Sequence, residues 1–374
     1  MKKVGIITFH CADNFGAVLQ VYALQEKVRQ LGFEVEVIDF KPDRILDSYS
    51  LFPNIIRTYK KRGFIRTVKH SIFKIKHFKK NYLRKKNFNN FRNEHLNKTK
   101  TSFSTSSDLH KFKPNFNYYI TGSDQVWNPD FFKEIGETYF LDFAPDDAVK
   151  ISYAASIAKH VDEDEAKVFK KNLKRFDYIS IREKSHIDFI SQFTNKNVMV
   201  TLDPTLLLSK KDWLKIASNR KSLFKYILVY DLVKNPLIIE TANKVAQFLN
   251  CKIVSYSSRK GYLNWHSSFY SNNPTEFLGL IDNAEFIITS SFHGTAFSII
   301  FNKPFYTVPH PTRGNRMKDL LNELGLAERL IENHNDIQKI NVNHSINYEQ
   351  INEKLLELKR TSNLFIEEAL GISR

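Results

Sequence analysis

The sequence predicts an α/β protein with two doubly wound domains, each a parallel sheet covered by helices. Three observations lead to this prediction. The chain has 374 residues, more than a single hydrophobic core usually organises. Segments with strand and helix character alternate along most of it. Polar turns, several of them with glycine, follow many of the expected strands, as they do at the ligand-binding edge of such sheets.

The first half begins with a β-prone run and continues with alternating helices and strands. Gly32 follows the helix expected over residues 17–31, where a C-terminal cap glycine belongs. The acidic run at residues 161–165 begins another helix and complements its dipole, so we do not interpret it as a metal site. We expect strands at residues 3–8, 34–39, 118–121, 150–155, 178–181 and 198–202.

The second half repeats the alternation. Asn273 is followed by Pro274 and Glu276, a pattern that predicts a helix N-terminus with a capping box. We expect strands at residues 226–230, 251–256, 285–289 and 305–308, and helices at 236–249, from 273 onward, at 317–324 and at 348–370. The predicted organisation is a Rossmann-like domain at residues 1–195, a second at 196–345 and a C-terminal helix at 346–374.

The positive charge is concentrated in a helical insert predicted at residues 55–100. The chain carries a net charge of +16, and residues 57–100 hold sixteen lysines and arginines against one acid, Glu94. Apolar residues recur there at helical spacing, at Ile65, Val68, Ile72, Ile75, Phe78 and Tyr82. A basic amphipathic helix can bind an anionic membrane or nucleic acid, or pack on its own domain with a solvated lysine face. We favour the membrane or an anionic glycolipid and expect no nucleic acid partner.

The cysteines and the N-terminus favour the cytoplasm. Cys11 and Cys251 are far apart in the sequence, which argues against a disulfide framework. The apolar run at residues 4–9 is too short for the core of a signal peptide, and no other run approaches the length of a membrane span. We expect a cytoplasmic protein, either free or attached peripherally to the inner face of the cell membrane.

The segment at residues 287–305 is the most informative stretch. It predicts a buried strand, a polar turn with His293 and Gly294, a short helix and a second strand. A histidine at a helix N-terminus lies beside free backbone N–H groups, where an anion would bind. The alternative interpretation is a helix-capping histidine in an ordinary turn.

Several kinds of chemistry lack their motifs. The sequence has no Cys-x-x-Cys or His-x-x-x-His spacing, no glycine-rich dinucleotide or phosphate loop, and no Gly-x-Ser-x-Gly. Histidine, arginine, aspartate and helix N-termini remain, and these suit an anionic donor and acid–base chemistry without a metal or organic cofactor. Arg313 and Arg316 flank a turn after a strand, where they would clamp a carboxylate or phosphate or simply lie in a surface loop.

Four segments together resemble the polysaccharide pyruvyl transferase family, over nearly the whole chain from Gly5 to about Leu330. The first runs from residue 5 to 24 and includes Asp13-Asn14-Phe15-Gly16-Ala17. The second is Gly122-Ser123-Asp124-Gln125-Val126-Trp127-Asn128-Pro129. The third combines Tyr153-Ala154-Ala155-Ser156 with Ser180-Ile181-Arg182-Glu183, and the fourth is Ser291-Phe292-His293-Gly294.

This resemblance implies a GT-B-like fold, phosphoenolpyruvate as donor and a sugar of a bacterial surface polysaccharide, free or lipid-linked, as acceptor. The product would be a pyruvate ketal, and no metal or organic cofactor is implied. His293 matches the general acid of the family. Many members carry an arginine two residues earlier, where this chain has Ser291. Either Arg182, Arg313 or Arg316 then supplies the positive charge, or the chain uses another donor or reaction.

The sequence therefore yields a set of candidate site residues. We assign His293 as acid and Asp124 or Glu183 as base, while Asp203 before Pro204 is expected to be structural. Expected donor contacts are Arg182, Ser290, Ser291, Gly294, Thr295, Arg313 and Arg316, and expected acceptor contacts are Asn14, Gly16, Ser123, Gln125 and Trp127. The alternatives to pyruvyl transfer are a GT-B glycosyltransferase that uses a nucleotide sugar, and a non-enzymatic basic module that binds membranes or nucleic acid.

Overall fold

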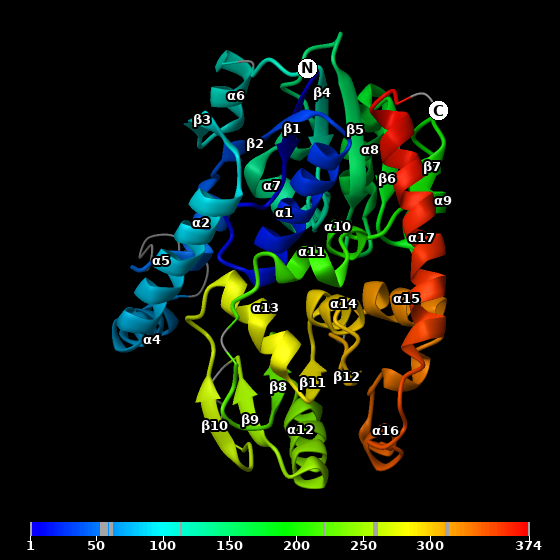
Figure 1. Ribbon diagram of the computed structural model, residues 1–374. Helices are drawn as coiled ribbons and strands as arrows, with labels where there is room; N and C mark the ends of the chain where they lie inside the picture. The colour runs from blue at the N-terminus through cyan, green and yellow to red at the C-terminus, as the bar shows by residue number, and fades with distance from the viewer. Residues whose placement is uncertain are drawn as a thin grey trace.

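Two parallel sheets form the framework of the protein (Figure 1). The computed structural model describes residues 2–52, 59, 63–112, 114–219, 221–256, 261–310 and 314–372. The first sheet has seven strands in the order β3-β2-β1-β4-β5-β6-β7, and the second has five in the order β10-β9-β8-β11-β12. Every strand pair in the described part of both sheets is parallel, and helices lie between most successive strands; no helix is described between β9 and β10. The predicted fold class of two doubly wound, Rossmann-like units is therefore confirmed.

The first sheet holds the N-terminal half of the core. Asn14 begins the long helix α1, because its side-chain oxygen accepts a hydrogen bond from the Ala17 N–H at 3.2 Å. The strands are β1 (Lys3–Ile7), β2 (Glu34–Phe40), β3 (Lys98–Phe103), β4 (Tyr118–Thr121), β5 (Val149–Ala155), β6 (Tyr178–Ile181) and β7 (Val198–Val200). The helices are α1 (Phe15–Gln30), α2 (Asp43–Tyr49), α6 (Ser106–Phe112), α7 (Pro129–Ile135), α8 (Glu163–Asn172) and α9 (Ile187–Ser191).

The second sheet follows two short helices, α10 (Pro204–Leu207) and α11 (Lys210–Leu214). The predicted capping box is confirmed, since the Asn273 side chain accepts from the Glu276 N–H at 2.7 Å and begins a helix. The strands are β8 (Tyr226–Tyr230), β9 (Lys252–Ser255), β10 (Trp265–Ser268), β11 (Phe286–Thr289) and β12 (Phe305–Thr307). The helices are α12 (Pro236–Leu249), α13 (Pro274–Asn283), α14 (Phe292–Ile300), α15 (Asn315–Leu324) and α16 (His334–Gln338).

The C-terminal helix α17 (Tyr348–Ala369) runs along both halves of the molecule (Figure 1). Its Ser362 hydroxyl accepts a hydrogen bond from the Leu202 N–H at 2.9 Å, and its Phe365 ring lies 6.2 Å from the ring of Tyr153. The first sheet also extends past residue 195, because β7 pairs with β6.

The sequence missed two edge strands, β3 and β10. Both carry mostly polar residues, Lys-Thr-Lys-Thr-Ser-Phe and Trp-His-Ser-Ser, and most of their side chains are at least partly exposed. Edge strands of this kind lack the apolar signal of central strands. Residues 98–100 belong to β3, so the helical part of the predicted insert ends before them.

The rest of the described insert forms two helices, α4 (Phe64–Lys76) and α5 (Phe78–His95), which are separated at His77. Helix α5 packs on the body through buried Phe88 and Phe91 and also contacts α13 of the second half. Just before α13, the Ser271 carbonyl accepts a hydrogen bond from the Asn87 amide at 2.5 Å. The insert is thus anchored to both halves.

Two further predictions concern the cysteines and the membrane. Cys11 and Cys251 are free and buried. Burial raises the pKa of the Cys11 thiol to about 12. No helix in the described ranges is both long and apolar enough to cross a membrane.

Candidate functional site

The site residues follow the strands at the switch points of the two sheets. In the first sheet β1 lies between β2 and β4, and in the second β8 lies between β9 and β11. At such a point the connecting helices leave toward opposite sides, and the turns after the two central strands border a crevice. Here those turns carry Asn14 after β1, Ser123 and Asp124 after β4, and Ser290 and Ser291 after β11.

A cavity of about 370 Å³ lies where these turns meet. Its wall includes Asn14, Asp124 and Gln125 from the first half, and Ser290, Ser291, His293 and Arg316 from the second. Seven of the predicted site residues therefore line one space between the two halves. Tyr49 and His310, which the sequence did not single out, also line it.

His293 is held tightly in the first turn of α14. The helix begins at Ser291, whose hydroxyl accepts from the Gly294 N–H at 3.4 Å, so the predicted strand–turn–helix segment is confirmed. The imidazole packs against the backbone of Gly16, where an added Cβ would lie 2.1 Å from His293 Nδ1. Gly294 likewise leaves room for Thr289, since a Cβ there would lie 2.2 Å from Thr289 Oγ1. Glycine at both positions is required for this close packing.

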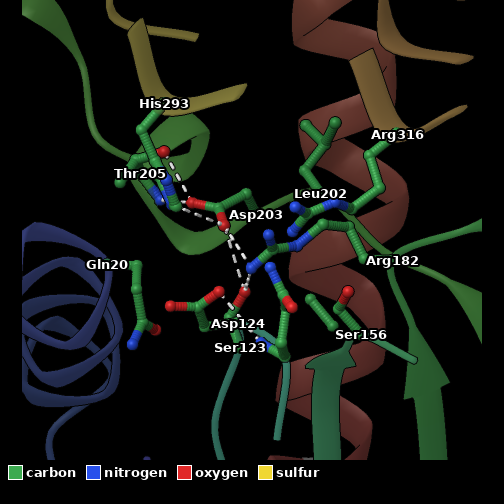
Figure 2. A network of polar contacts seen from close by, with 12 residues as sticks. Gln20, Ser123, Asp124, Ser156, Arg182, Leu202, Asp203, Thr205, His293 and Arg316 are labelled. Carbon is green, nitrogen blue, oxygen red and sulfur yellow. Dashed lines mark hydrogen bonds and ion pairs between the residues drawn. The ribbon is translucent and has the colours of Figure 1, made fainter. Parts of the chain in front are cut away.

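Asp203 connects His293 to the arginine of the first half (Figure 2). Its Oδ2 lies 3.4 Å from His293 Nε2 and 2.6 Å from Arg182 Nη2, and it accepts from the Ser123 hydroxyl at 3.1 Å. Its Oδ1 accepts from the backbone and the hydroxyl of Thr205. Burial alone would raise the pKa of Asp203, but Arg182 and His293 outweigh it and hold that pKa well below its usual range.

Asp203 was expected to be structural because it precedes a proline at the start of a short helix. It does cap α10, but the same carboxylate also contacts Arg182 and His293. The sequence does contain a signal for this role of Asp203, because Asp203 follows a strand segment of the first sheet, as the other site residues follow theirs.

Arg316 is a largely buried cation with little compensation. Its side chain is 12% exposed, and its Nε lies 3.8 Å from Glu183 Oε1, a long contact. No acceptor among the described residues forms a hydrogen bond with that Nε. Burial, and then the neighbouring Arg182, lower the pKa of Arg316. A cation in this position favours the entry of an anion into the cavity.

Phe292 lies between the two arginines. The guanidinium carbons of Arg182 and Arg316 are 5.1 and 5.7 Å from the centre of its ring. The ring therefore stabilises both cations from the α14 side, which fixes their guanidinium groups near His293.

The two candidate bases occupy different places. Asp124 lines the main cavity and has a backbone φ of 78°, in the left-handed region that few residues other than glycine adopt. Glu183 lies across Arg316 in a neighbouring cavity of about 330 Å³. There it accepts hydrogen bonds from the Ser156 hydroxyl and from the Ile157 N–H at 3.3 Å. Only Asp124 shares a wall with His293.

Some predicted contact residues are turned away from the cavity. Trp127 is fully buried in the first core, where its ring stacks on Phe140 at 5.4 Å and its N–H donates to the Tyr139 carbonyl at 3.2 Å. Thr295 is also fully buried, and its hydroxyl bonds to the Ser291 carbonyl. Ser123 is buried beneath Asp203. Arg313 lies outside the described residues.

The basic insert contributes to the site from behind, which the sequence did not indicate. Arg84 and Arg92 of α5 are buried. Arg84 Nε donates to the Asp13 carbonyl at 3.1 Å, and Arg92 Nη2 pairs with the Asp13 carboxylate at 2.7 Å. These bonds hold the turn that carries Asn14. In the part of the chain that the structure covers, no group of three or more acidic, histidine or cysteine side chains is arranged to hold a metal ion.

Comparison with known proteins gives a family and a fold. The family model described as "Polysaccharide pyruvyl transferase" matches residues 14–311. A search of the curated proteins finds no match to the chain.

Among solved structures, UDP-GlcNAc 2-epimerase from Methanocaldococcus jannaschii is similar with a TM-score of 0.51 and 12% identity, over 98% of this chain and 99% of that one. The S. aureus MnaA–UDP co-structure has a TM-score of 0.50 and 12% identity, over 100% and 98%. A Thermobaculum terrenum O-GlcNAc transferase mutant matches at a TM-score of 0.44 and 10% identity; the match covers 99% of this chain but 66% of that one. The first two similarities support a GT-B-like arrangement of the two Rossmann-like units. At 12% identity they support the fold and nothing about the activity.

Proposed function

Because the chain belongs to the polysaccharide pyruvyl transferase family, we propose that it transfers a pyruvyl group from phosphoenolpyruvate to a saccharide. The acceptor is a sugar of a bacterial surface polysaccharide or its lipid-linked precursor, and the product is a pyruvate ketal. The observation that carries this proposal is the position of Arg316. It is a largely buried, poorly compensated cation on the wall of a cavity that His293 and Asp124 also line.

The donor carries a phosphate and a carboxylate, and the cavity offers positive charge for both. Arg316 is the better anchor, because Arg182 is already paired with Asp203 at 2.6 Å. The N-terminus of α14 adds backbone N–H groups beside Ser290 and Ser291. Arg316 thus takes the role that the missing arginine at position 291 has in other members of the family.

His293 acts as the acid. It protonates the methylene carbon of phosphoenolpyruvate, which becomes a methyl group while C2 becomes an oxocarbenium-like centre. Asp203 supports the charged imidazole beforehand through the contact between its Oδ2 and His293 Nε2. The first sugar hydroxyl adds to C2, and Asp124 accepts its proton.

The second hydroxyl then attacks C2 as the bond from C2 to the phosphate oxygen breaks, which completes the ketal. Its proton passes to the His293 imidazole and restores the acid, and the proton held by Asp124 leaves with the phosphate. Two carbon–oxygen bonds form and one bond to the phosphate oxygen breaks, so each ketal releases one inorganic phosphate. The acceptor contacts Asn14 and Gln125, which line the same cavity. Residues of this chain supply the proton transfer and the positive charge, so the proposal assigns no step to a metal or an organic cofactor.

The test is incubation of the purified protein with phosphoenolpyruvate and a panel of bacterial saccharides and lipid-linked precursors. We expect release of inorganic phosphate that depends on one acceptor, together with a pyruvylated product in the mass spectrum. UDP-sugars are the matched donors, because the S. aureus neighbour is a complex with UDP. Turnover with a UDP-sugar and none with phosphoenolpyruvate would replace the proposal with glycosyl transfer.

A further inference from the structure

Helix α4 exposes an apolar stripe on the side away from the body. Phe64, Val68, Ile72 and Ile75 are 71, 41, 60 and 70% exposed. At about 100° per residue these four positions fall within about 80° of the helix circumference. Lys74 points elsewhere, toward the body, where its Nζ donates to the Ser50 carbonyl at 2.6 Å. The sequence predicted this helical face, but the structure shows that no described part of the protein covers these four side chains.

The stripe continues onto α5 and is flanked by cations. Phe78 and Tyr82 stack at 6.3 Å and are both exposed. Exposed lysines follow directly, at Lys76, Lys79, Lys80 and Lys86. The described residues offer none of these four lysines a carboxylate partner. Figure 1 shows α4 at the outer edge of the molecule, beside α5.

We propose that this face, the α4–α5 stripe with its flanking lysines, docks the protein on an anionic membrane surface. An amphipathic basic helix buries its apolar side chains at the level of the headgroups while its lysines contact acidic lipids. A second copy of the chain would fit less well, since it would bring two sets of unpaired lysines together. A nucleic acid duplex would use the lysines and leave the isoleucines and phenylalanines without a role.

The docking face and the catalytic cavity share one helix. Arg84 of α5 holds the Asp13 carbonyl, next to cavity-lining Asn14, and lies only six residues beyond Phe78. Six residues of α-helix span about 9 Å. A membrane bound at the stripe therefore lies close to the cavity entrance, where an acceptor carried on a lipid would reach the site. The docking itself does not depend on which group the enzyme transfers.

The experiment measures binding of the full-length protein to vesicles, without donor or acceptor. Neutral phosphatidylcholine vesicles are compared with vesicles that contain about one third phosphatidylglycerol. One variant, Ile72→Ser with Ile75→Ser, removes apolar contacts and keeps the charge. The other, Lys79→Glu with Lys80→Glu, reverses charge and keeps the stripe. Leu356→Ser on α17 is the control for the apolar variant. Lys170→Glu with Lys174→Glu, on the far side of the first unit, is the control for the charge reversal. The side chains at these three positions are exposed.

We expect binding to the anionic vesicles only, which weakens as salt rises because the Debye length is about 8 Å at physiological ionic strength. Each lysine at an anionic surface contributes roughly fivefold, so the charge reversal should weaken binding at least tenfold. Loss of the two isoleucines should also weaken it at least tenfold. The control variants should bind as the wild type does.

Three results would overturn the proposal. The first is absence of wild-type binding to anionic vesicles, whether or not the protein forms dimers through the stripe. The second is binding that persists unchanged in either double variant. The third is tight binding to a DNA duplex that matches or exceeds vesicle binding and ignores the isoleucines. None of these results bears on phosphate release from phosphoenolpyruvate, so the two proposals fail separately.

Discussion

Gly16→Ala tests whether the close packing of His293 matters for catalysis. The new methyl group would lie 2.1 Å from His293 Nδ1, whereas an ordinary contact is 3.4–4 Å, so the ring must retreat by more than 1 Å. That movement breaks the contact of His293 Nε2 with Asp203. A misplacement of about 1 Å costs about 10²-fold in rate, so we expect kcat to fall by about that factor.

The fold should tolerate the change. Overpacking should lower the free energy of unfolding by about 1–3 kcal/mol, and the higher helix propensity of alanine in α1 should raise it by about 1 kcal/mol. The net loss in the free energy of unfolding should therefore not exceed about 2 kcal/mol. Phosphate release measures kcat, and guanidinium denaturation measures stability.

Gly279→Ala is the matched control for this substitution. Gly279 lies in α13, where an added Cβ would lie 2.5 Å from the Ser218 carbonyl oxygen, and Gly279 does not line the catalytic cavity. We expect it to lose stability but to keep kcat. A folded Gly16→Ala protein with wild-type turnover would refute the role of this packing, as would an equal loss of turnover in Gly279→Ala.

Three more substitutions test the network around the cavity. Asp203→Asn breaks a buried ion pair and should lower the free energy of unfolding by about 3–5 kcal/mol. Because the folded pKa of Asp203 is depressed, its contribution is complete above the unfolded pKa near 3.9 and falls by about 1.4 kcal/mol per pH unit below that. Denaturation curves from pH 8 to 3 should keep the full difference between wild type and variant down to about pH 4 and narrow by about 1 kcal/mol at pH 3; convergence near neutrality would contradict this. His293→Ala should lower turnover by about 10² or more while circular dichroism stays unchanged, and wild-type turnover in a folded variant would remove it from the mechanism. Arg84→Met should lower the free energy of unfolding, measured by urea denaturation, by about 2–4 kcal/mol. It removes a charged hydrogen bond to the Asp13 carbonyl and a cation that lies 4.5 Å from the centre of the Tyr270 ring. Unchanged stability would show that the insert does not hold the turn at Asp13.

The sequence was sufficient for the fold because the central strands are apolar and the turns after them are polar. The turns predicted a cleft lined from both halves, whereas the switch points follow from the strand order that the structure shows. The pairing of Asp203 could not be read from the sequence, because its partners Arg182 and His293 come from other segments of the chain. The burial of Trp127 could not be read for a similar reason, since nothing local shows that its ring stacks on Phe140 inside the core.

The basic insert shows the same limit in a different form. Its charge and its helical apolar spacing were visible in the sequence. Which cations turn inward was not, because Arg84 and Arg92 look like their exposed neighbours Lys80 and Lys86. Their burial depends on aromatic rings and carbonyls supplied by other elements, such as Tyr270 and Asp13. Long-range contacts of this kind separate the structural arginines from the surface lysines.

The most direct test of the central claim is titration of the protein with phosphoenolpyruvate, since donor binding needs no knowledge of the acceptor. We predict saturable binding that weakens about 10- to 100-fold in Arg316→Gln, in line with the loss of charged hydrogen bonds worth about 1.5–3 kcal/mol. Lys318→Gln, a partly exposed cation on the same helix, should leave binding unchanged. Absence of binding to the wild type, or equal affinity in Arg316→Gln, would contradict the assignment of this cavity as the donor site.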